Sequence, residues 1–531
     1  MMDAALASFR FWAVALLVSS LAFTATADPT SPVSVTPPPT GVGVAFVPGF
    51  RTIADLPQEY VEEEYLVSGV SDLFNYAHNP PLGPTDIVPI ATDVPYTTRM
   101  IVRRPASHGP FKGTVVIEWW NSTAGFDTAP AWDASAEYFA RNGVIYVGVT
   151  NSTTSLGFLT GGCSVFNVLP PTCGTRYATL SLPENGLAYE MMSQIANLLK
   201  SDSPENPLPA NFEVERIYHT GQSQQGGSMV TYASAFHFDV NDGYFVQQAG
   251  TARSINSGPV CGAEGSPPFP DCTPRLQGSD RLVRTDLPVP VVHAITETDI
   301  EILFGTVGRQ ADTPTFRYYE IAGGGHLTVH KGVEVLPAGV FGPNPLFLES
   351  LCQFPLNTTA DGAVFVSYVF NAMWENMEQQ VQVGATPPSG VQMDVVAGVV
   401  QRDAFGNGLG GVRLPSLEAP VATYTPGNQA DPNLPGFLQF IGNLACALAS
   451  SQSAFDEATL DGLYPNHGNY VSQVVAAANQ LRAEGLLLPK DRKTIVNRAS
   501  MSTVGCGIGF ELALVLPPII WLRNRRRRPA A

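Results

Sequence analysis

The sequence predicts an α/β fold with a mostly parallel central sheet and helices on both faces. Short apolar runs of strand length alternate with segments of helical periodicity, a pattern typical of parallel strands joined by crossover helices. Several of the apolar runs have no polar face, as expected of strands buried on both sides. The composition also suits a large core, because 44% of the 531 residues are hydrophobic and only 14% are charged.

The first expected elements are two amphipathic strands at 60–69 and 97–105, which could pair antiparallel. A Pro- and Thr-rich lead at 28–44 precedes them, and we expect it to be extended and flexible. Residues 113–120, GTVVIEWW, form a denser apolar strand that suits the centre of the sheet. The remaining strands are expected at 144–150, 214–221, 242–250, 288–296 and 315–326, and the helices at 131–143, 183–202, 226–236 and 467–489.

Together these elements predict one domain over residues 45–495. Three stretches rich in Gly, Pro or Ser, at 151–182, 251–285 and 340–430, are expected to be loop-rich insertions. The last of them could form a cap. Residues 496–503 are expected to be a tether that leads to the C-terminal tail.

The sequence patterns at both ends of the chain predict targeting segments. Residues 1–27 contain Arg10, an apolar run and an Ala-Thr-Ala site, the layout of a secretory signal peptide. Residues 504–531 contain an apolar span and five arginines, the pattern of a transmembrane anchor with a cytoplasmic basic end. The tail also resembles bacterial C-terminal sorting signals, which implies that a sorting protease could cleave it. We therefore expect an exported protein that is anchored in the cell envelope or secreted after tail processing.

Charge and cysteine content narrow the classes of partner. The formal net charge of −17 argues against binding to nucleic acid or to an anionic membrane surface. Six cysteines lie between the two ends, and an even number in an exported chain favours disulfides. Near-neighbour pairing would join Cys163 to Cys173, Cys261 to Cys272, and Cys352 to Cys446, while other pairings stay open. No CxxC occurs, so we expect no metal.

The stretch HTGQSQQGGSMVTY, residues 219–232, indicates a catalytic serine. Ser223 follows a predicted strand, opens a predicted helix and lies between Gly221 and Gly226. A serine hydroxyl is a weak nucleophile on its own. It needs a base, a carboxylate that orients the base, and N–H donors for the oxyanion.

The partners of this serine would come from later strand ends. Asp299 lies in HAITETDIEIL and His326 lies in EIAGGGHLTVH, which gives the chain order nucleophile, acid, histidine. Glu297 is the alternative acid, because a two-residue shift of the strand end would exchange it with Asp299.

Two backbone N–H groups would form the oxyanion hole. One would come from Gln224, directly after the serine, and the other from Asn121 or Trp120, behind the central strand at 113–120.

Several segments resemble the bacterial, often exported family called "alpha/beta hydrolase domain". They include VVIEWWNSTAGFDTAPAW, GQSQQGGSMVTYA, ITETD, EIAGGGHL and LYPNHGNYVSQVVAAANQLRAEGLLLP. The resemblance covers roughly residues 45–495 and implies an alpha/beta-hydrolase fold with Ser223 as nucleophile and His326 as base. Gln225 departs from the pattern, because the second residue after the nucleophile is usually small in such turns.

We therefore expect an exported serine hydrolase that cleaves carboxylic esters through an acyl-enzyme. The substrate would be a small-molecule or polymer ester. The alternatives are a non-catalytic surface binding protein on the same scaffold and a depolymerase of polyesters or polysaccharide esters. No cofactor is expected, because the sequence has no dinucleotide-binding or phosphate-cradling glycine loop.

Overall fold

The computed structural model describes residues 30–164, 172–256, 276–327, 334–336, 346–357 and 364–504. The predicted signal peptide, the predicted C-terminal span and the predicted Cys261–Cys272 pair lie outside these residues. In the part that is described, no helix combines the length and apolar character needed to cross a bilayer.

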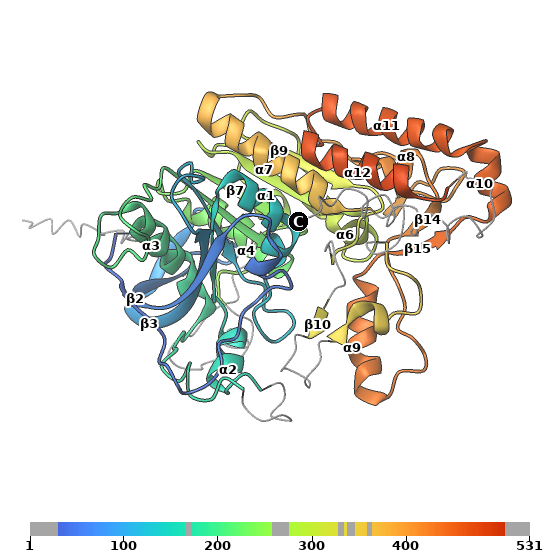
Figure 1. Cartoon of the computed structure of the whole chain (residues 1–531). Helices are drawn as coiled ribbons and strands as arrows, with labels where there is room; N and C mark the ends of the chain where they lie inside the picture. The colour runs from blue at the N-terminus through green and yellow to red at the C-terminus, as the bar shows by residue number, and fades with distance from the viewer. Residues whose placement is uncertain are drawn as a thin grey trace, which may run out of the picture.

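A nine-stranded sheet forms the centre of the molecule, with strand order β1-β2-β3-β5-β4-β6-β7-β8-β9 (Figure 1). The strands from β5 to β9 in this order run parallel, and β1, β2 and β3 add an antiparallel edge. The bounds are β1 Ser34–Thr36, β2 Tyr60–Tyr76, β3 Ile87–Pro105, β4 Thr114–Trp119, β5 Ile145–Val149, β6 Arg216–Gln222, β7 Gly243–Gln247, β8 Val291–Thr296 and β9 Phe316–Ile321. The predicted fold class, a mostly parallel sheet with flanking helices, is confirmed.

Helices cover both faces of this sheet. On one face, α1 and α7 pack against each other, and Trp374 of α7 contacts Phe245 of β7 with ring centroids 4.9 Å apart. On the other face, Trp119 of β4 packs against Tyr189 of α3 and Tyr232, at 5.4 and 5.1 Å. The helices are α1 Pro130–Asn142, α2 Thr153–Thr160, α3 Ala188–Lys200, α4 Gln224–Thr231, α6 Glu297–Glu301, α7 Val366–Val383, α8 Pro415–Glu418, α9 Gly436–Ala447, α10 Glu457–Leu463, α11 His467–Ala483 and α12 Pro489–Met501.

Three two-stranded ladders lie outside the central sheet in the described residues. They are β10 Glu334–Leu336 with β11 Leu346–Phe347, β12 Val395–Val396 with β13 Val399–Val400, and β14 Ala422–Thr425 with β15 Ser451–Ala454.

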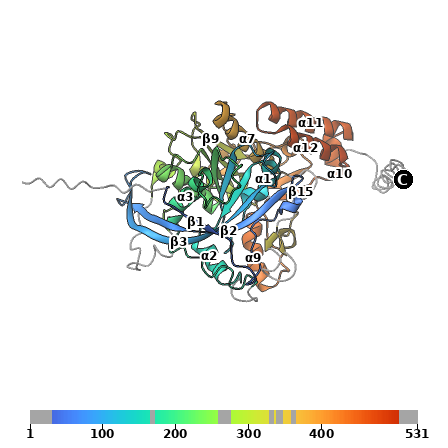
Figure 2. The same cartoon turned by 60° about the vertical axis from the view of Figure 1, so that its left-hand side comes forward.

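The structure corrects three boundaries of the predicted organisation. Residues 34–36 of the lead expected to be flexible pair with β2 and extend the edge of the sheet (Figure 2). The region 340–430 is not a loop-rich cap throughout, because it contains the 18-residue helix α7, whose apolar side is buried on the sheet. The tether expected at 496–503 lies largely within α12, which packs on α11.

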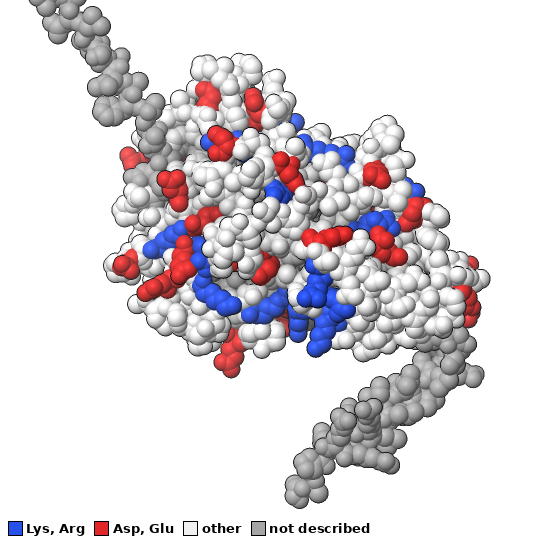
Figure 3. Space-filling view, turned by 90° about the horizontal axis from the view of Figure 1, so that it is seen from above, with Lys and Arg blue, Asp and Glu red and all other residues white. Residues whose placement is uncertain are grey.

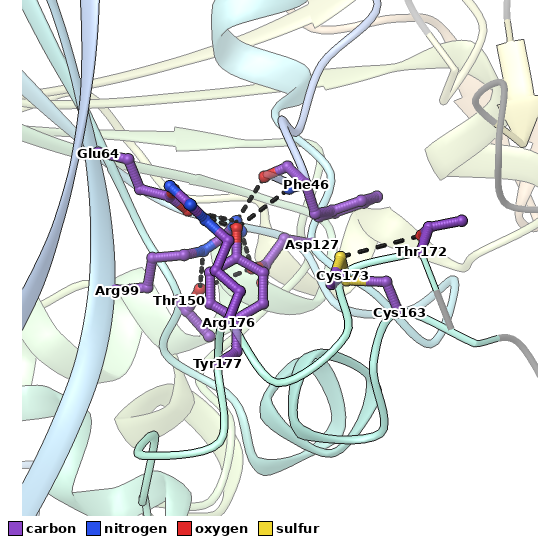
Figure 4. Close-up of a disulfide and its surroundings, with 10 residues drawn as sticks. All are labelled: Phe46, Glu64, Arg99, Asp127, Thr150, Cys163, Thr172, Cys173, Arg176 and Tyr177. Carbon is purple, nitrogen blue, oxygen red and sulfur yellow. Dashed lines mark hydrogen bonds and ion pairs between the residues drawn. A yellow bond between two sulfur atoms is a disulfide. The ribbon is translucent and has the colours of Figure 1, made fainter. Parts of the chain in front are cut away.

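The antiparallel edge contains a buried charge cluster, which we call the Arg99 cluster: Glu64, Arg99, Asp127, Thr150, Arg176 and Tyr177 (Figure 4). The Arg99 guanidinium donates to Asp127 Oδ2 at 2.8 Å, and its carbon lies 5.0 Å from the centroid of the Trp120 ring. The Cys163–Cys173 disulfide closes the loop beside this cluster. A second disulfide, Cys352–Cys446, joins the segment before α7 to α9. Both pairs match the predicted pairing.

Acidic and basic side chains are interspersed on the face seen from above in Figure 3. The net negative charge therefore forms no continuous acidic field on that face.

Candidate active site

The serine singled out in the sequence lies on a sharp turn between β6 and α4. Ser223 has φ 56° and ψ −114°, a backbone conformation that costs about 1–3 kcal/mol in a non-glycine residue and is concentrated at functional sites. The Ser223 N–H donates to Gln247 O of the neighbouring strand at 2.9 Å, which helps to hold the turn. The turn places Ser223, which is partly exposed, at the carboxyl edge of the parallel sheet.

The unusual Gln225 is accommodated by the glycine before the turn. A Cβ atom on Gly221 would lie 2.5 Å from Gln225 O and 3.0 Å from Gln225 Cβ. Because Gly221 has no side chain, the first turn of α4 can pass close to β6 with a glutamine at this position. Gln225 is buried within that helix, and the strained turn at Ser223 forms in its presence.

His326 and Asp299 are directly hydrogen bonded. His326 Nδ1 lies 2.5 Å from Asp299 Oδ1, and both side chains are almost completely buried. The second carboxylate oxygen, Asp299 Oδ2, accepts from Thr296 N at 2.6 Å and from Thr296 Oγ1 at 2.8 Å, as part of the capping box of α6. These bonds fix the carboxylate, and the carboxylate in turn orients the imidazole.

Glu297, the alternative acid, has other partners. Its Oε2 accepts from Gly323 N at 2.7 Å, and its Oε1 pairs with Arg402 Nη1. Burial raises the pKa of Glu297, and the Arg402 charge opposes that rise. Of the two carboxyl groups considered from the sequence, the structure brings Asp299 to the histidine and directs Glu297 to an ion pair.

On the other side of the ring, His326 Nε2 lies 3.2 Å from Gln222 Nε2. No hydrogen bond joins Ser223 Oγ to His326 among the residues that the structure describes. Gln222 is buried, and its contact with the histidine is not among those predicted from the sequence. The glutamines on both sides of Ser223 in the sequence are the feature that could have indicated a role for Gln222.

The predicted oxyanion donors need one correction. The Asn121 N–H donates to Thr128 O at 3.1 Å and the Trp120 N–H donates to Val149 O at 3.3 Å, so both are engaged in the backbone of the loop and the sheet. The Asn121 side chain instead donates to Gln222 O and Gln222 Oε1, at 2.9 and 3.0 Å.

Gln224 stays at the predicted place, at the first position of α4. Its Oε1 accepts a hydrogen bond from Ser122 Oγ at 3.1 Å, which brings the loop after β4 against the turn. The backbone N–H of Ser122, the next along this loop after Asn121, donates to no carbonyl among the described residues, which makes it a better candidate for the second donor than the Asn121 N–H.

A cavity of about 820 Å³ opens beside the start of α4. Its walls combine amide and hydroxyl side chains with two aromatic rings and two arginines. They include Trp119, Tyr189, Gln224, Ser228, Arg253 and Arg281. Such a space can hold an organic molecule of moderate size. Gln224 and Gln225, which follow Ser223 in the chain, line it, whereas Ser223 and His326 do not. In the described part of the chain, no three His, Cys, Asp or Glu side chains are arranged to hold a metal ion.

A comparison with protein-family profiles agrees with this architecture. A family profile described as "Alpha/beta hydrolase domain" matches residues 33–497. A search of curated protein sequences finds no match.

Among solved structures, the esterase Pf2001 of Pyrococcus furiosus is 12% identical, with a TM-score of 0.24 over 54% of this chain and 89% of that one. Esterases from Rhizomucor miehei give 11% identity and a TM-score of 0.24, over 50% of this chain and 74% of theirs. The esterase Est22 gives 13% identity and a TM-score of 0.24, over 49% and 71%. With its parallel sheet, its strained serine turn and a family match over most of its length, the chain belongs to the alpha/beta hydrolase domain family.

Proposed function

We propose that the protein is an exported serine hydrolase that cleaves carboxylic esters. The observation that carries the proposal is the buried Asp299–His326 hydrogen bond next to the strained turn at Ser223. A serine on such a turn, a histidine held by a carboxylate and N–H donors nearby are the parts that acyl transfer requires. Export is proposed from the sequence of residues 1–27 and 504–531.

In the proposed reaction, Ser223 Oγ attacks the ester carbonyl while His326 Nε2 takes the hydroxyl proton. The C–O bond to the alcohol then breaks, and the imidazolium gives its proton to the departing alkoxide. Water attacks the acyl-enzyme in the same way and releases the acid. Asp299 keeps the proton on Nδ1 and stabilises the transient imidazolium, and the N–H groups of Gln224 and Ser122 would bind the oxyanion.

Two measurements test this proposal. The purified protein should react with a fluorophosphonate probe and hydrolyse short nitrophenyl esters, and Ser223→Ala should abolish both activities. Ser228→Ala is a control, since Ser228 lies five residues further along, within α4, and lines the cavity at the start of that helix. Probe labelling that persists in Ser223→Ala, or no labelling of the folded wild type, would contradict the proposal.

A further inference from the structure

The side chain of Gln222 connects the ends of several strands at the candidate site. Gln222 Nε2 lies 3.1 Å from Gln248 Oε1 after β7, and 3.2 Å from His326 Nε2 after β9. Gln222 Oε1 accepts from Asn121 Nδ2, after β4, at 3.0 Å. The residue is itself the last of β6 and is only 5% exposed. Its amide is therefore a buried junction that touches the imidazole.

Backbone groups at both ends set the direction of this hydrogen-bond chain. At one end, the Thr123 N–H donates to Asn121 Oδ1 at 2.8 Å, so Asn121 must turn its NH₂ group towards Gln222 Oε1. At the other end, Gln248 Nε2 donates to Gly325 O at 3.0 Å, so Gln248 Oε1 needs a donor. Both constraints require Gln222 to present its NH₂ group to Gln248, and the same group faces the histidine ring.

An NH₂ donor beside Nε2 favours one form of the ring. When Nδ1 bears the proton that bonds Asp299, an unprotonated Nε2 can accept from the Gln222 NH₂ group, which also lies 3.3 Å from His326 O. A protonated Nε2 would set an N–H group against the N–H groups of Gln222. We propose that Gln222 is a positioning residue that holds the His326 ring neutral, with its unprotonated Nε2 facing the amide of the residue before Ser223. This inference rests on the proposed function, because a neutral imidazole in this tautomer is the general base of that reaction.

The other titratable groups near the ring leave this role to Gln222. Asp299 is hydrogen bonded to Nδ1 and therefore contacts the side of the imidazole opposite to Gln222. Glu297 is engaged by Gly323 and Arg402. His293 of β8 is buried, and burial lowers its pKa to about 4, so it carries no charge at neutral pH.

The test changes the group that faces Nε2 and follows the protonation of the ring. In Gln222→Glu a carboxylate replaces the amide and can accept from a protonated Nε2. In Gln222→Met the donor is lost without a new charge. The readouts are the NMR titration midpoint of the His326 ring and the acidic limb of the kcat/KM profile. We expect both to move to higher pH by about one unit or more in Gln222→Glu, and by a smaller amount in the same direction in Gln222→Met.

Controls separate this inference from the proposed function. Gln473→Glu adds the same charge on the exposed face of α11 and should leave the midpoint in place. Gln248→Leu breaks the chain without touching Nε2 and should give a small upward shift, even if Gln222→Glu does not fold. The NMR titration needs no turnover, so shifts in a protein that hydrolyses no ester would sustain the positioning role and contradict the esterase. Unchanged midpoints in folded Gln222→Met and Gln248→Leu would overturn the positioning role, whatever the activity.

Discussion

Two buried polar networks in this molecule each pair a carboxylate with a basic side chain, but the basic side chains differ in whether they can lose a proton. In the Arg99 cluster, a fully buried guanidinium faces the Asp127 carboxylate at 2.8 Å, and Glu64 accepts from Arg176 at 2.6 Å. At the candidate site, the buried carboxylate of Asp299 faces an imidazole. A permanent charge pair stabilises one geometry, whereas an imidazole beside a carboxylate can gain and lose a proton. Under the proposed function, the first network has a structural role and the second a chemical one.

Substitution of the two neighbouring carboxyl groups of α6 should give the largest contrast. We expect Asp299→Asn to lower kcat by about 10⁴-fold, because the amide would favour the wrong tautomer of His326. Glu297→Gln should change kcat less than about tenfold, because Glu297 contacts Arg402 and Gly323 rather than the ring. Ester hydrolysis assays on both variants, with circular dichroism as the check on folding, measure the contrast. Equal losses of kcat would contradict the assignment of Asp299 as the acid.

Breaking the Arg99 cluster should affect stability instead of chemistry. Arg99→Met would leave Asp127 buried without its cation, and loss of one partner of a buried pair costs about 3–5 kcal/mol. Urea denaturation should show this fall in the free energy of unfolding. The folded fraction should keep kcat within a few-fold of wild type. A normal stability with a large loss of kcat would reverse the roles that we give to the two networks.

The two disulfides should contribute unequally to stability. The Cys352–Cys446 bond spans 94 residues and the Cys163–Cys173 bond spans 10. By chain entropy alone, the longer loop should stabilise the fold by about 5 kcal/mol and the shorter by about 3 kcal/mol. Paired Cys→Ser variants compared by urea denaturation test this ranking. A larger loss of stability on removal of the Cys163–Cys173 disulfide would show that this bond, which lies beside the Arg99 cluster, supports that cluster directly.

The smallest expected effect is a pH dependence of stability from Glu118 of β4. Burial raises the pKa of Glu118 to about 8, despite hydrogen bonds from Tyr146 and from the N–H groups of Ala131 and Trp132. Between an unfolded pKa near 4.5 and about 8, the folded state therefore binds the extra proton, and stability falls as pH rises. From pH 6.5 to 8 the free energy of unfolding should decline by up to about 1.4 kcal/mol per pH unit.

The range starts at pH 6.5 so that titration of the buried histidines does not contribute to the measured change in stability. Burial lowers the pKa of His219 to about 3 and that of His293 to about 4, so these groups reduce stability only as pH falls below about 6.5. Glu118→Gln should be less stable overall, because it loses an acceptor, but it should lack the decline above pH 6.5. A decline that persists in this variant would assign the effect to another group.

The sequence was informative wherever side-chain pattern determines structure. The apolar runs located the parallel strands, and the strand ends located Ser223, Asp299 and His326. Pattern could not reveal contacts made by the backbone. The pairing of residues 34–36 with β2 and the bond from the Asn121 N–H to Thr128 O depend on main-chain atoms that every residue has. The segment that forms α12 is polar almost all round, and its packing on α11 is decided by tertiary context.

Mass spectrometry of the probe-treated protein tests the central claim most directly. After reaction with a fluorophosphonate, the peptide that contains residues 219–232 should carry one phosphonyl group, on Ser223 and not on Ser228. Prior unfolding of the protein should prevent the reaction, because the reactive serine depends on the strained turn and on the buried histidine. A folded protein in which Ser223 stays unmodified, or in which another serine takes the label, would contradict the account.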